Sequence, residues 1–409
     1  MIGAAPSPAP SRRVKFLLVV VFLVVCVASL QVMPVLTPWG ADLQNLQAYA
    51  RCASGGRSPY EIAGRACGDH WGRPFFYPPF LLACFRWTRP LTLAGAMYVW
   101  TAFLFAAFAG IFWVWAKKIA RAPAPPGERH QVVIFCALLL LQFPFVFALE
   151  RGNTDTVNVL LYSLAALLLV RRRSWWAGVA AGVAAGFKLS PVVAVVVMTG
   201  ALLLARARAG AWTWLRFSGG ALAAFALTLL VFFRDSRTYL FTVLPKYAGT
   251  LTPLNAWNHA TPSFVGGDYP RFALLLCLGL LAVWVWAGAR AIERGDDGLA
   301  LAGSLAVSTF VQRTSFDYNL ITVYPLLLLL FLRAQATNRF ALLAFGLFAI
   351  AGDRRLFTSP GAVLLTPHLH LTVELAFLVV AALVIARPDG AEPPGGGAPR
   401  AASMGVDAG

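Results

Sequence analysis

A carboxylate stands near the start of the first long polar interval of this sequence. Asp42 lies a few residues beyond Met33, where the first long apolar run ends. A carboxylate held just outside a bilayer can take the proton of an acceptor hydroxyl and so act as a general base. Asp42 is equally a common type of helix N-cap, here for a short surface helix that begins at Leu43. Both interpretations stand on the sequence alone.

Two further polar groups interrupt the apolar runs. The turn from Glu150 to Asp155 contains Asn153, and its amide and carboxylate groups can hydrogen-bond a polyhydroxy ligand. A helix cap with a Glu–Arg ion pair is the alternative. Lys188 is an isolated lysine between two apolar stretches, and Pro191 breaks the helix there. It is either a fixed cation for a phosphate at the membrane surface or a snorkelling side chain.

The later part of the chain has two more sets of polar residues beside apolar runs. Asn258 and His259 lie in a long polar interval, and a histidine can serve as acid, base or phosphate donor. A lone loop histidine often has none of these roles. Arg313, Asp317 and Tyr318 precede another apolar run. They are either a further wall of the same polar site or a surface Arg–Asp pair worth under about 1 kcal/mol.

The composition predicts the environment of these groups. A soluble domain carries roughly 25% charged residues, whereas this chain of 409 residues has 12% charged and 59% hydrophobic residues. Repeated apolar runs near the bilayer length predict a multi-span helical membrane protein, because hydrocarbon cannot satisfy free backbone groups. A net charge of +17 would suggest nucleic-acid binding in a soluble protein. Here the basic residues form short clusters between apolar runs, so we expect no nucleic-acid partner.

The apolar runs also predict a topology. The predicted spans are roughly 14–33, 93–116, 131–149, 155–170, 174–188, 190–205, 212–233, 270–288, 298–311, 318–332, 339–351 and 370–386. With the amino terminus inside, every inside connection is basic, as the positive-inside rule requires. All the polar groups described above then lie on the outer side. Several spans have only about 14 residues, so they must be tilted, broken or partly re-entrant.

One transmembrane domain, residues 14–386, therefore accounts for most of the chain. Its two long outer loops are 34–78 and 234–269. The Pro/Ala/Ser-rich segment 1–13 and the Gly/Pro/Ala-rich tail 387–409 are predicted to be disordered and cytoplasmic.

Two shorter patterns predict how segments lie. The apolar stretch from Pro79 to Pro90 is short and contains arginines, so we interpret it as an interfacial helix on the outer side. Gly178, Gly182 and Gly186 repeat every four residues and predict a close helix-packing face. They do not indicate a nucleotide-binding loop, because no Gly-Lys-Ser/Thr pattern follows.

Two cysteines share the first outer loop. Cys52 and Cys67 can form a disulfide if that loop is extracytoplasmic, and two free thiols are the alternative. The sequence has no CxxC pair or His/Cys cluster, so we expect no metal site.

Several short motifs occur in an order similar to that of the family 87 glycosyltransferases, which are polytopic membrane enzymes of the GT-C superfamily. The resemblance extends over roughly residues 14–335, and its last motif has Phe and Tyr where Trp and His are common. The matching pieces are Asp42 with Tyr49, Gly56 and Pro59-Tyr60; Phe76-Tyr77-Pro78-Pro79; Gly152-Asn153-Thr154-Asp155; Gly182 through Lys188 with Pro191; Asn258-His259 with Ser263-Phe264; and Ser315-Phe316-Asp317-Tyr318.

This resemblance implies a fold and a reaction. The fold would be a GT-C-like bundle of about 11 to 13 transmembrane helices with a large first extracytoplasmic loop. The reaction would be an inverting transfer of a hexose, typically mannose, from a polyprenyl-phosphate carrier to a lipid or glycan hydroxyl. It would take place on the outer face of the cytoplasmic membrane. We expect membrane lipids as further partners and no cofactor.

The resemblance also implies roles for single residues. Asp42 would deprotonate the acceptor. Lys188, with His259 or Arg313, would hold the departing phosphate, whose charge grows in the transition state. The other candidate substrate-binding residues are Tyr77, Glu150, Asn153, Asp155, Asn258, Asp317 and Tyr318.

A transporter or flippase of lipid-linked sugars is the alternative function, since it too would have many spans and polar residues at broken helices. Two observations favour the enzyme. The two halves of the chain show no internal repeat, and the polar residues gather on one side of the predicted membrane rather than at its midplane. A non-catalytic subunit of an envelope-building complex is a further alternative.

Overall fold

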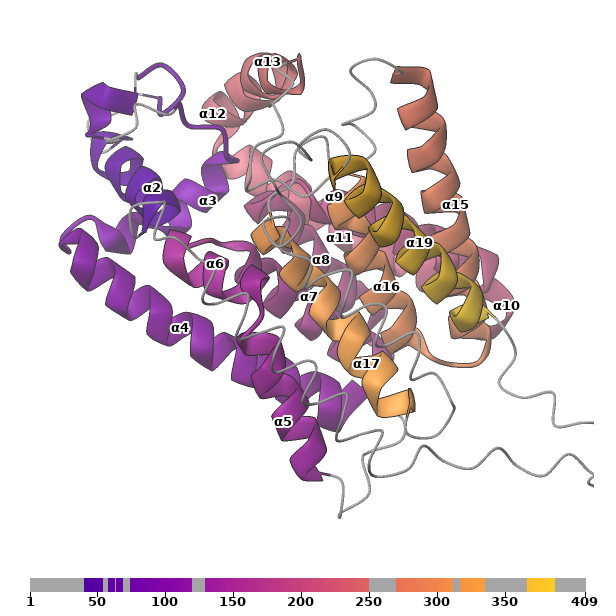
Figure 1. The fold of residues 1–409 in the computed structure, drawn as a ribbon. Helices are drawn as coiled ribbons and strands as arrows, with labels where there is room; N and C mark the ends of the chain where they lie inside the picture. Colours follow the sequence, from indigo (N-terminus) through magenta and orange to yellow (C-terminus); the bar gives the residue numbers. More distant parts are fainter. Residues whose placement is uncertain are drawn as a thin grey trace, which may run out of the picture.

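The computed structural model describes residues 40–53, 58–62, 64–68, 74–119, 129–249, 270–311, 317–334 and 366–386. Every regular element in these ranges is a helix, so the predicted all-α class is confirmed. Figure 1 shows a bundle with α2 and α3 at one end, beside one end of α4. The predicted spans 14–33 and 339–351, the terminal segments 1–13 and 387–409, and residues 250–269 lie outside the described residues.

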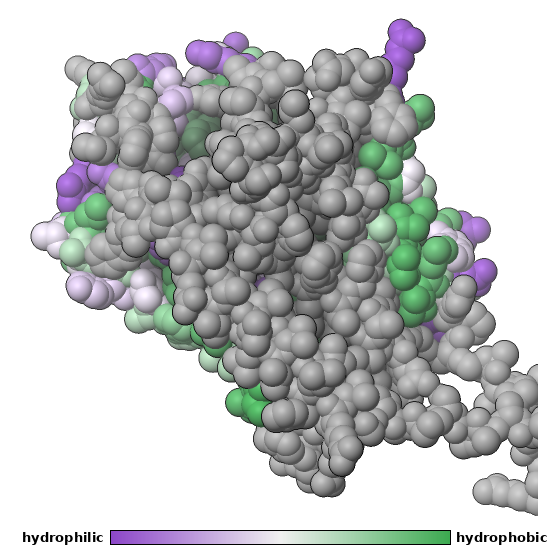
Figure 2. All heavy atoms as spheres, in the orientation of Figure 1, coloured by the Kyte–Doolittle hydropathy of each residue, from purple (hydrophilic) through white to green (hydrophobic). Residues whose placement is uncertain are grey.

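Three helices in the described part of the chain are long and apolar enough to cross a membrane. They are α4 (Leu93–Trp113), which a π-helical turn (Val114–Ile119) extends, α11 (Thr213–Val231) and α15 (Pro270–Glu293). Their outer faces carry exposed apolar side chains, such as Leu222 at 69%. Figure 2 shows hydrophobic surface along the α4 side and near α15, with hydrophilic surface towards the ends. Lipid explains such a surface, so the chain is a multi-pass membrane protein.

A fourth long apolar segment is broken into two helices. The predicted span 131–149 is two helices, α5 (Arg129–Leu140) and α6 (Phe143–Arg151), bent by 50° at the break. The prediction of one span over 131–149 did not include this break. Pro144 lies in the first turn of α6, where its missing N–H costs nothing, but it could not have continued α5.

Most of the remaining apolar helices are shorter, and all of them overlap predicted spans; the last, with 21 residues, begins four residues before the predicted span 370–386. They are α7 (Asp155–Val170), α8 (Ser174–Phe187), α9 (Pro191–Leu204), α16 (Asp297–Phe310), the 3₁₀ helix η7 (Asp317–Val323) with α17 (Tyr324–Ala334), and α19 (Thr366–Ala386). The short connecting helices are α10 (Arg206–Ala209), α12 (Phe233–Thr238), a π-helical turn (Tyr239–Val243) and α13 (Leu244–Gly249).

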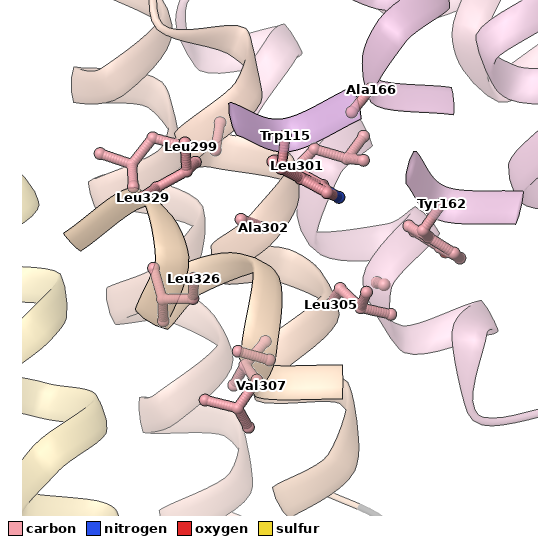
Figure 3. Close-up of a cluster of buried hydrophobic side chains, with 14 of the residues drawn as sticks. Trp115, Tyr162, Ala166, Leu299, Leu301, Ala302, Leu305, Val307, Leu326 and Leu329 are labelled. Carbon is pink, nitrogen blue, oxygen red and sulfur yellow. The ribbon is translucent and has the colours of Figure 1, made fainter. Parts of the chain in front are cut away.

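The main core lies where α7, α16, α17 and the π-helical turn after α4 meet. Every residue of α16 is buried, so α16 is the central helix of this group. Figure 3 shows Trp115, Tyr162, Leu305 and Leu326, one from each of these elements, in one cluster. In lipid such a core is held by close van der Waals packing rather than by removal from water.

Helices α8 and α11 approach each other through glycines. A Cβ at Gly178 would overlap the carbonyl of Phe217, and one at Gly182 would overlap the carbonyl of Ala221. The close-packing face predicted from the four-residue glycine repeat is thus confirmed. It fixes the position of α8, which ends next to Lys188.

The first long loop folds over one end of the bundle. The predicted loop 34–78 contains α2 (Ala41–Cys52) and the 3₁₀ turn η2 (Gly64–Cys67). It is followed by α3 (Pro79–Cys84) and the 3₁₀ turn η3 (Arg86–Thr88), which lie in the segment Pro79–Pro90. The last two elements are too short to cross a membrane, as expected for the segment Pro79–Pro90. A second buried cluster joins this loop to the bundle, with ring contacts of Phe85 to Trp100 and to Phe187.

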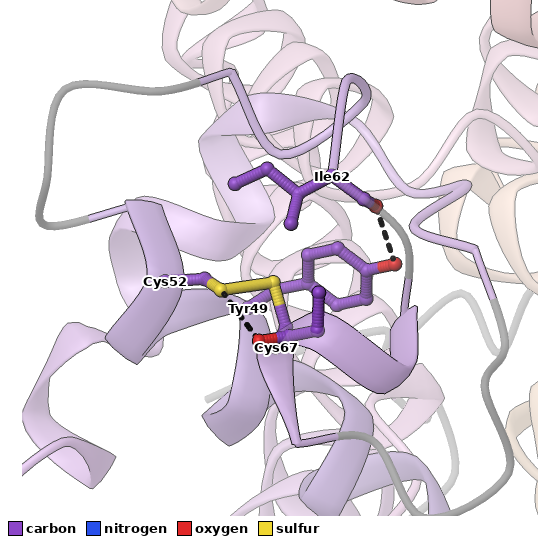
Figure 4. The surroundings of a disulfide bond; sticks show 5 residues. Tyr49, Cys52, Ile62 and Cys67 are labelled. Atoms are coloured by element: carbon purple, nitrogen blue, oxygen red, sulfur yellow. Dashed lines mark hydrogen bonds between the residues drawn. A yellow bond between two sulfur atoms is a disulfide. The ribbon is translucent and has the colours of Figure 1, made fainter.

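A disulfide closes the first loop. Cys52, at the end of α2, is bonded to Cys67 in η2, so the disulfide prediction is confirmed and the free-thiol alternative is wrong. Figure 4 shows the bridge beside Tyr49, whose hydroxyl donates to the carbonyl of Ile62 at 3.4 Å. Tyr60 donates to the carbonyl of Tyr77 at 2.6 Å, and burial raises the pKa of Tyr60 well above its ordinary value. The phenol therefore remains a donor at any physiological pH.

Candidate active site

The turn between α6 and α7 is attached to the start of α2. Gly152 ends α6 with φ of 67°, a left-handed conformation that favours glycine. A Cβ at this position would lie 2.7 Å from the Cβ of Leu43, so the turn packs directly on α2. The backbone N–H of Gly40 donates to the carbonyl of Glu150 at 2.6 Å. These contacts hold Asp42, in the first turn of α2, against the turn.

Asp42 is buried, with 4% of its surface exposed, and its carboxylate is paired. Arg151 donates to both oxygens, from Nη2 to Oδ1 at 2.6 Å and from Nε to Oδ2 at 3.2 Å. Asn153 Nδ2 donates to Oδ2 at 3.2 Å. The N-cap of α2 is Gly40, so the capping interpretation of Asp42 is wrong. The helix begins two residues earlier than expected, and its amino-terminal dipole favours the carboxylate in the first turn.

A second ion pair joins Asp155 and Lys188. Nζ of Lys188 lies 2.7 Å from Oδ1 and 2.8 Å from Oδ2 of Asp155, which is 2% exposed. Lys188 is the C-cap of α8, with an extended backbone, and α9 begins three residues later at Pro191. The break that the proline produces thus turns the lysine towards the start of α7. The side chain is held by a buried carboxylate, which the snorkelling alternative does not predict.

Asn153 connects the two ion pairs. Its Nδ2 donates to Asp42, and its Oδ1 accepts from the backbone N–H of Asp155 at 2.8 Å. Its own carbonyl accepts from Nε1 of Trp100 at 3.3 Å, which fixes the backbone on α4. Carboxylates and cations balance in this network, as buried charges require. The arrangement is one continuous polar cluster built from α2, the α6–α7 turn and the end of α8.

Two other candidate residues lie close by in the fold. Tyr77 is buried and stacks on Phe76 with ring centroids 4.5 Å apart. It belongs to the buried cluster that also contains Phe187, the residue before Lys188. Glu150 is half-buried, and its carbonyl is the one that accepts from Gly40. Their binding of substrate stays a prediction.

The remaining candidates are placed only in part. Asn258, His259 and Arg313 lie outside the described residues. Asp317 and Tyr318 open η7, which packs against α6 and α7, so their backbone lies near the turn that carries Asn153. That they form a common wall with the other candidate residues stays a prediction.

Two residues of this region were not among the sequence candidates. The alternative interpretation of the turn paired Arg151 with its neighbour Glu150, whereas the structure shows Arg151 paired with Asp42. Asn45 lies one turn beyond Asp42 on α2 and is 2% exposed, and neither of its amide atoms has a hydrogen-bond partner among the described residues. The spacing of three residues from Asp42, which places two polar groups on one helix face, was the available signal.

Comparison with known proteins decides the family. Residues 75–315 match the profile of glycosyltransferase family 87. The chain belongs to this family. It is therefore a glycosyltransferase, and the transporter alternative is set aside. The family match includes the α6–α7 turn and Lys188, while Asp42 lies before it.

Curated relatives of this family 87 enzyme come from mycobacteria. The chain is 27% identical over 344 residues to a polyprenol-phosphate-mannose-dependent alpha-(1-2)-phosphatidylinositol pentamannoside mannosyltransferase of Mycobacterium tuberculosis (strain CDC 1551 / Oshkosh), covering 79% of this chain and 75% of the relative. It is 26% identical over 340 residues to the protein of the same name from Mycolicibacterium smegmatis, and the match covers 79% of this chain and 78% of the relative. No solved structure matches significantly.

Proposed function

We propose that this enzyme transfers mannose from a polyprenyl-phosphate carrier to a hydroxyl of a mannosylated phosphatidylinositol lipid. The names of the relatives support the donor and the acceptor class. The observation that carries the proposal is the buried network in which Asn153 links the Asp42–Arg151 and Asp155–Lys188 pairs. It offers both a base and a cation for a phosphate leaving group, and a lipid-linked donor requires no nucleotide site.

Asp42 is the proposed general base. The acceptor hydroxyl gives its proton to the carboxylate as its oxygen forms a bond to the anomeric carbon. The bond from that carbon to the phosphate oxygen breaks, and the electron pair leaves with the polyprenyl phosphate. Such a single displacement inverts the anomeric centre. Because both carboxylate oxygens now accept bonds from Arg151 or Asn153, the acceptor hydroxyl must share or replace one of them.

Lys188 is the proposed cation for the leaving group. A phosphodiester becomes a phosphate monoester in this step, so negative charge grows on the phosphate, and a preorganised cation stabilises it. Asp155 holds the ammonium in place beforehand through two hydrogen bonds. Binding of the donor would draw Lys188 towards the phosphate and weaken its bonds to Asp155.

The other candidates complete the proposed site. Tyr77, Glu150, Asn258, His259, Arg313, Asp317 and Tyr318 would line the path of the donor and the acceptor. The site would face the extracytoplasmic side of the cytoplasmic membrane. Two features support this side: the basic connections that the predicted topology places inside, and the disulfide between Cys52 and Cys67, since disulfides persist in oxidising compartments.

Purified enzyme supplied with polyprenyl-phosphate-[¹⁴C]mannose and phosphatidylinositol mannosides tests the proposal. Label in a larger glycolipid with the wild type, and its loss in Asp42→Asn, is the expected result. Label with both proteins would remove Asp42 as the base but keep the reaction. Absence of labelled glycolipid with folded wild type would overturn the proposed donor or acceptor.

A further inference from the structure

Three arginines line an open hollow between α2 and the segment Pro79–Pro90. Arg51, in the last turn of α2, and Arg86 and Arg89, in and after η3, surround a space of about 520 Å³ together with Pro90. No carboxylate is among the residues that line this hollow in the described part of the chain. Such a concentration of guanidinium groups attracts an anion, and phosphate is the anion that fits their fork of donors best.

Hydrogen bonds from α2 to the turn around η3 build this hollow. Arg51 donates from Nε to the carbonyl of Arg89 at 3.1 Å and from Nη2 to the carbonyl of Leu91 at 2.6 Å. Gln47, which is buried, donates from Nε2 to the carbonyls of Thr88 and Leu91 at 2.7 and 2.9 Å. These bonds fix the backbone of the turn that carries Arg86 and Arg89 on α2, so the three arginines are kept around one hollow.

A second cavity shares one lining residue, Arg86, with the hollow. Arg86 also lines this space of about 220 Å³, whose polar lining includes Ser58, Arg234 and Asp235. Ser58 Oγ donates to Oδ1 of Asp235 at 2.7 Å. A hydroxyl, a carboxylate and a guanidinium are the groups that bind polyols, since each hydroxyl of a polyol can both donate and accept. The two spaces together therefore present an anion site next to a polyol site.

The surroundings indicate the level of lipid headgroups. Trp87 lies between the two arginines of the turn and is 36% exposed, and exposed tryptophans of membrane proteins lie preferentially at the membrane–water interface. Phe85, on the inner side of the same turn, packs against Phe187 with ring centroids 6.3 Å apart. The turn that carries the arginines is thus packed on the aromatic cluster, and Lys188 is the next residue after Phe187 in the chain.

We propose that this hollow binds the phosphodiester of the acceptor lipid on Arg51, Arg86 and Arg89, and that the adjoining cavity takes its polyol headgroup. This inference rests on the proposed function for the identity of the acceptor. Several sugars separate the phosphate of such a lipid from its accepting hydroxyl. When that hydroxyl lies at Asp42, the phosphate of the acceptor must therefore bind at a distance from Asp42. The donor phosphate, in contrast, must lie beside the reacting carbon near Asp42 and Lys188.

A binding experiment tests the hollow without relying on transfer. The variant Arg86→Gln/Arg89→Gln changes two exposed side chains and spares Arg51, which holds the turn. The matched control is Arg206→Gln/Arg208→Gln, which removes two exposed arginines from α10 at the opposite end of the bundle (Figure 1). Fluorescent phosphatidylinositol and diacylglycerol with the same acyl chains are the probes. Wild type and control should bind phosphatidylinositol more tightly than diacylglycerol. In the Arg86/Arg89 variant the ratio of the two affinities should fall about tenfold. An unchanged preference overturns the proposal.

A kinetic experiment then tests the assignment to the acceptor. With phosphatidylinositol mannoside as acceptor, KM should rise about tenfold in Arg86→Gln/Arg89→Gln while kcat stays near the wild-type value. With an alkyl mannoside, which has no phosphate, KM should be unchanged. An equal rise for both acceptors overturns the assignment. If wild type uses neither acceptor, the proposed function fails, and the binding comparison still decides whether the hollow recognises the phosphodiester.

Discussion

The guanidinium of Arg151 holds both carboxylate oxygens of Asp42, although 109 residues separate the two along the chain. The contact fastens the first loop to the α6–α7 turn, beside the backbone bond from Gly40 to Glu150. Removing one partner of a buried ion pair leaves the other charge uncompensated, which typically costs about 3–5 kcal/mol. Any substitution of Asp42 therefore has to be separated into its effect on catalysis and its effect on folding.

Asp42→Asn is expected to lower kcat by about 10²–10⁴-fold, because an amide cannot take the acceptor proton. Binding of the lipid-linked donor should change little, since the base contacts the acceptor. Radiolabel transfer and donor binding, measured on the same preparation, check both statements.

The matched control for this experiment is Arg151→Gln. It removes the same ion pair but leaves the carboxylate, so it should lower thermal stability about as much as Asp42→Asn while retaining more of the turnover. If the two variants lose turnover in proportion to their stability, Asp42 is a structural residue and not the base.

Lys188→Met is expected to weaken binding of the polyprenyl-phosphate donor by about tenfold or more, the usual loss for a charged hydrogen bond to phosphate. It should also destabilise the fold, because Asp155 is then buried without its cation. Donor binding by titration and thermal unfolding in detergent measure the two effects.

The double variant Asp155→Leu/Lys188→Met separates these effects. Removing both charges should restore much of the stability, since an apolar pair of similar volume is often no worse than a buried ion pair. Donor binding should remain weak. Recovery of donor binding together with stability would show that Lys188 only supports the fold.

Cys52→Ser and Cys67→Ser should each lower the melting temperature by a similar amount. The bridge joins residues 15 positions apart, and closing a loop of that length contributes about 3 kcal/mol in the chain-entropy model. The double variant should be no less stable than either single variant. Cys84→Ser, which changes an exposed free cysteine, is the control and should have no effect. Stability that is unaffected by loss of Cys52 or Cys67 would contradict the prediction.

Gly182→Ala should destabilise the enzyme, because the added methyl group overlaps the carbonyl of Ala221 and forces α8 and α11 apart. Gly110→Ala is the matched control: it lies in α4, has open space around its Cβ position, and should be neutral or stabilising. Melting temperatures of the two variants check the difference. A tolerated alanine at position 182 would mean that the two helices are not in close contact.

The sequence predicted the positions of helices well where an apolar run was bounded by basic residues or proline. The predicted spans 155–170 and 174–188 differ by at most one residue from α7 and α8. The break between α5 and α6 was missed because apolar residues continue on both sides of it. The sequence signals of this break were Gln142 and Pro144, and hydropathy averaged over a window does not detect two such residues.

The candidate site was predictable as a set of residues but not as a set of contacts. Asp42, Asn153, Asp155 and Lys188 stood out because polar groups beside apolar runs are costly without a partner. Which residue would be the partner depends on tertiary packing that no local pattern contains. The one partner considered for Arg151 was therefore its neighbour Glu150, as an alternative, whereas the carboxylate that pairs with Arg151 comes from another segment of the chain.

The long separation between Asp42 and Arg151 has a consequence during biosynthesis. Asp42 leaves the ribosome 109 residues ahead of its cation, and at about 5–20 residues per second this interval lasts about 5–20 s. Throughout that time water must solvate the carboxylate, so α2 cannot dock in its final place. The first loop therefore docks only after α4, α5 and α6 have been synthesised. A nascent chain released before Arg151 lacks the cation that this end of the enzyme needs to assemble.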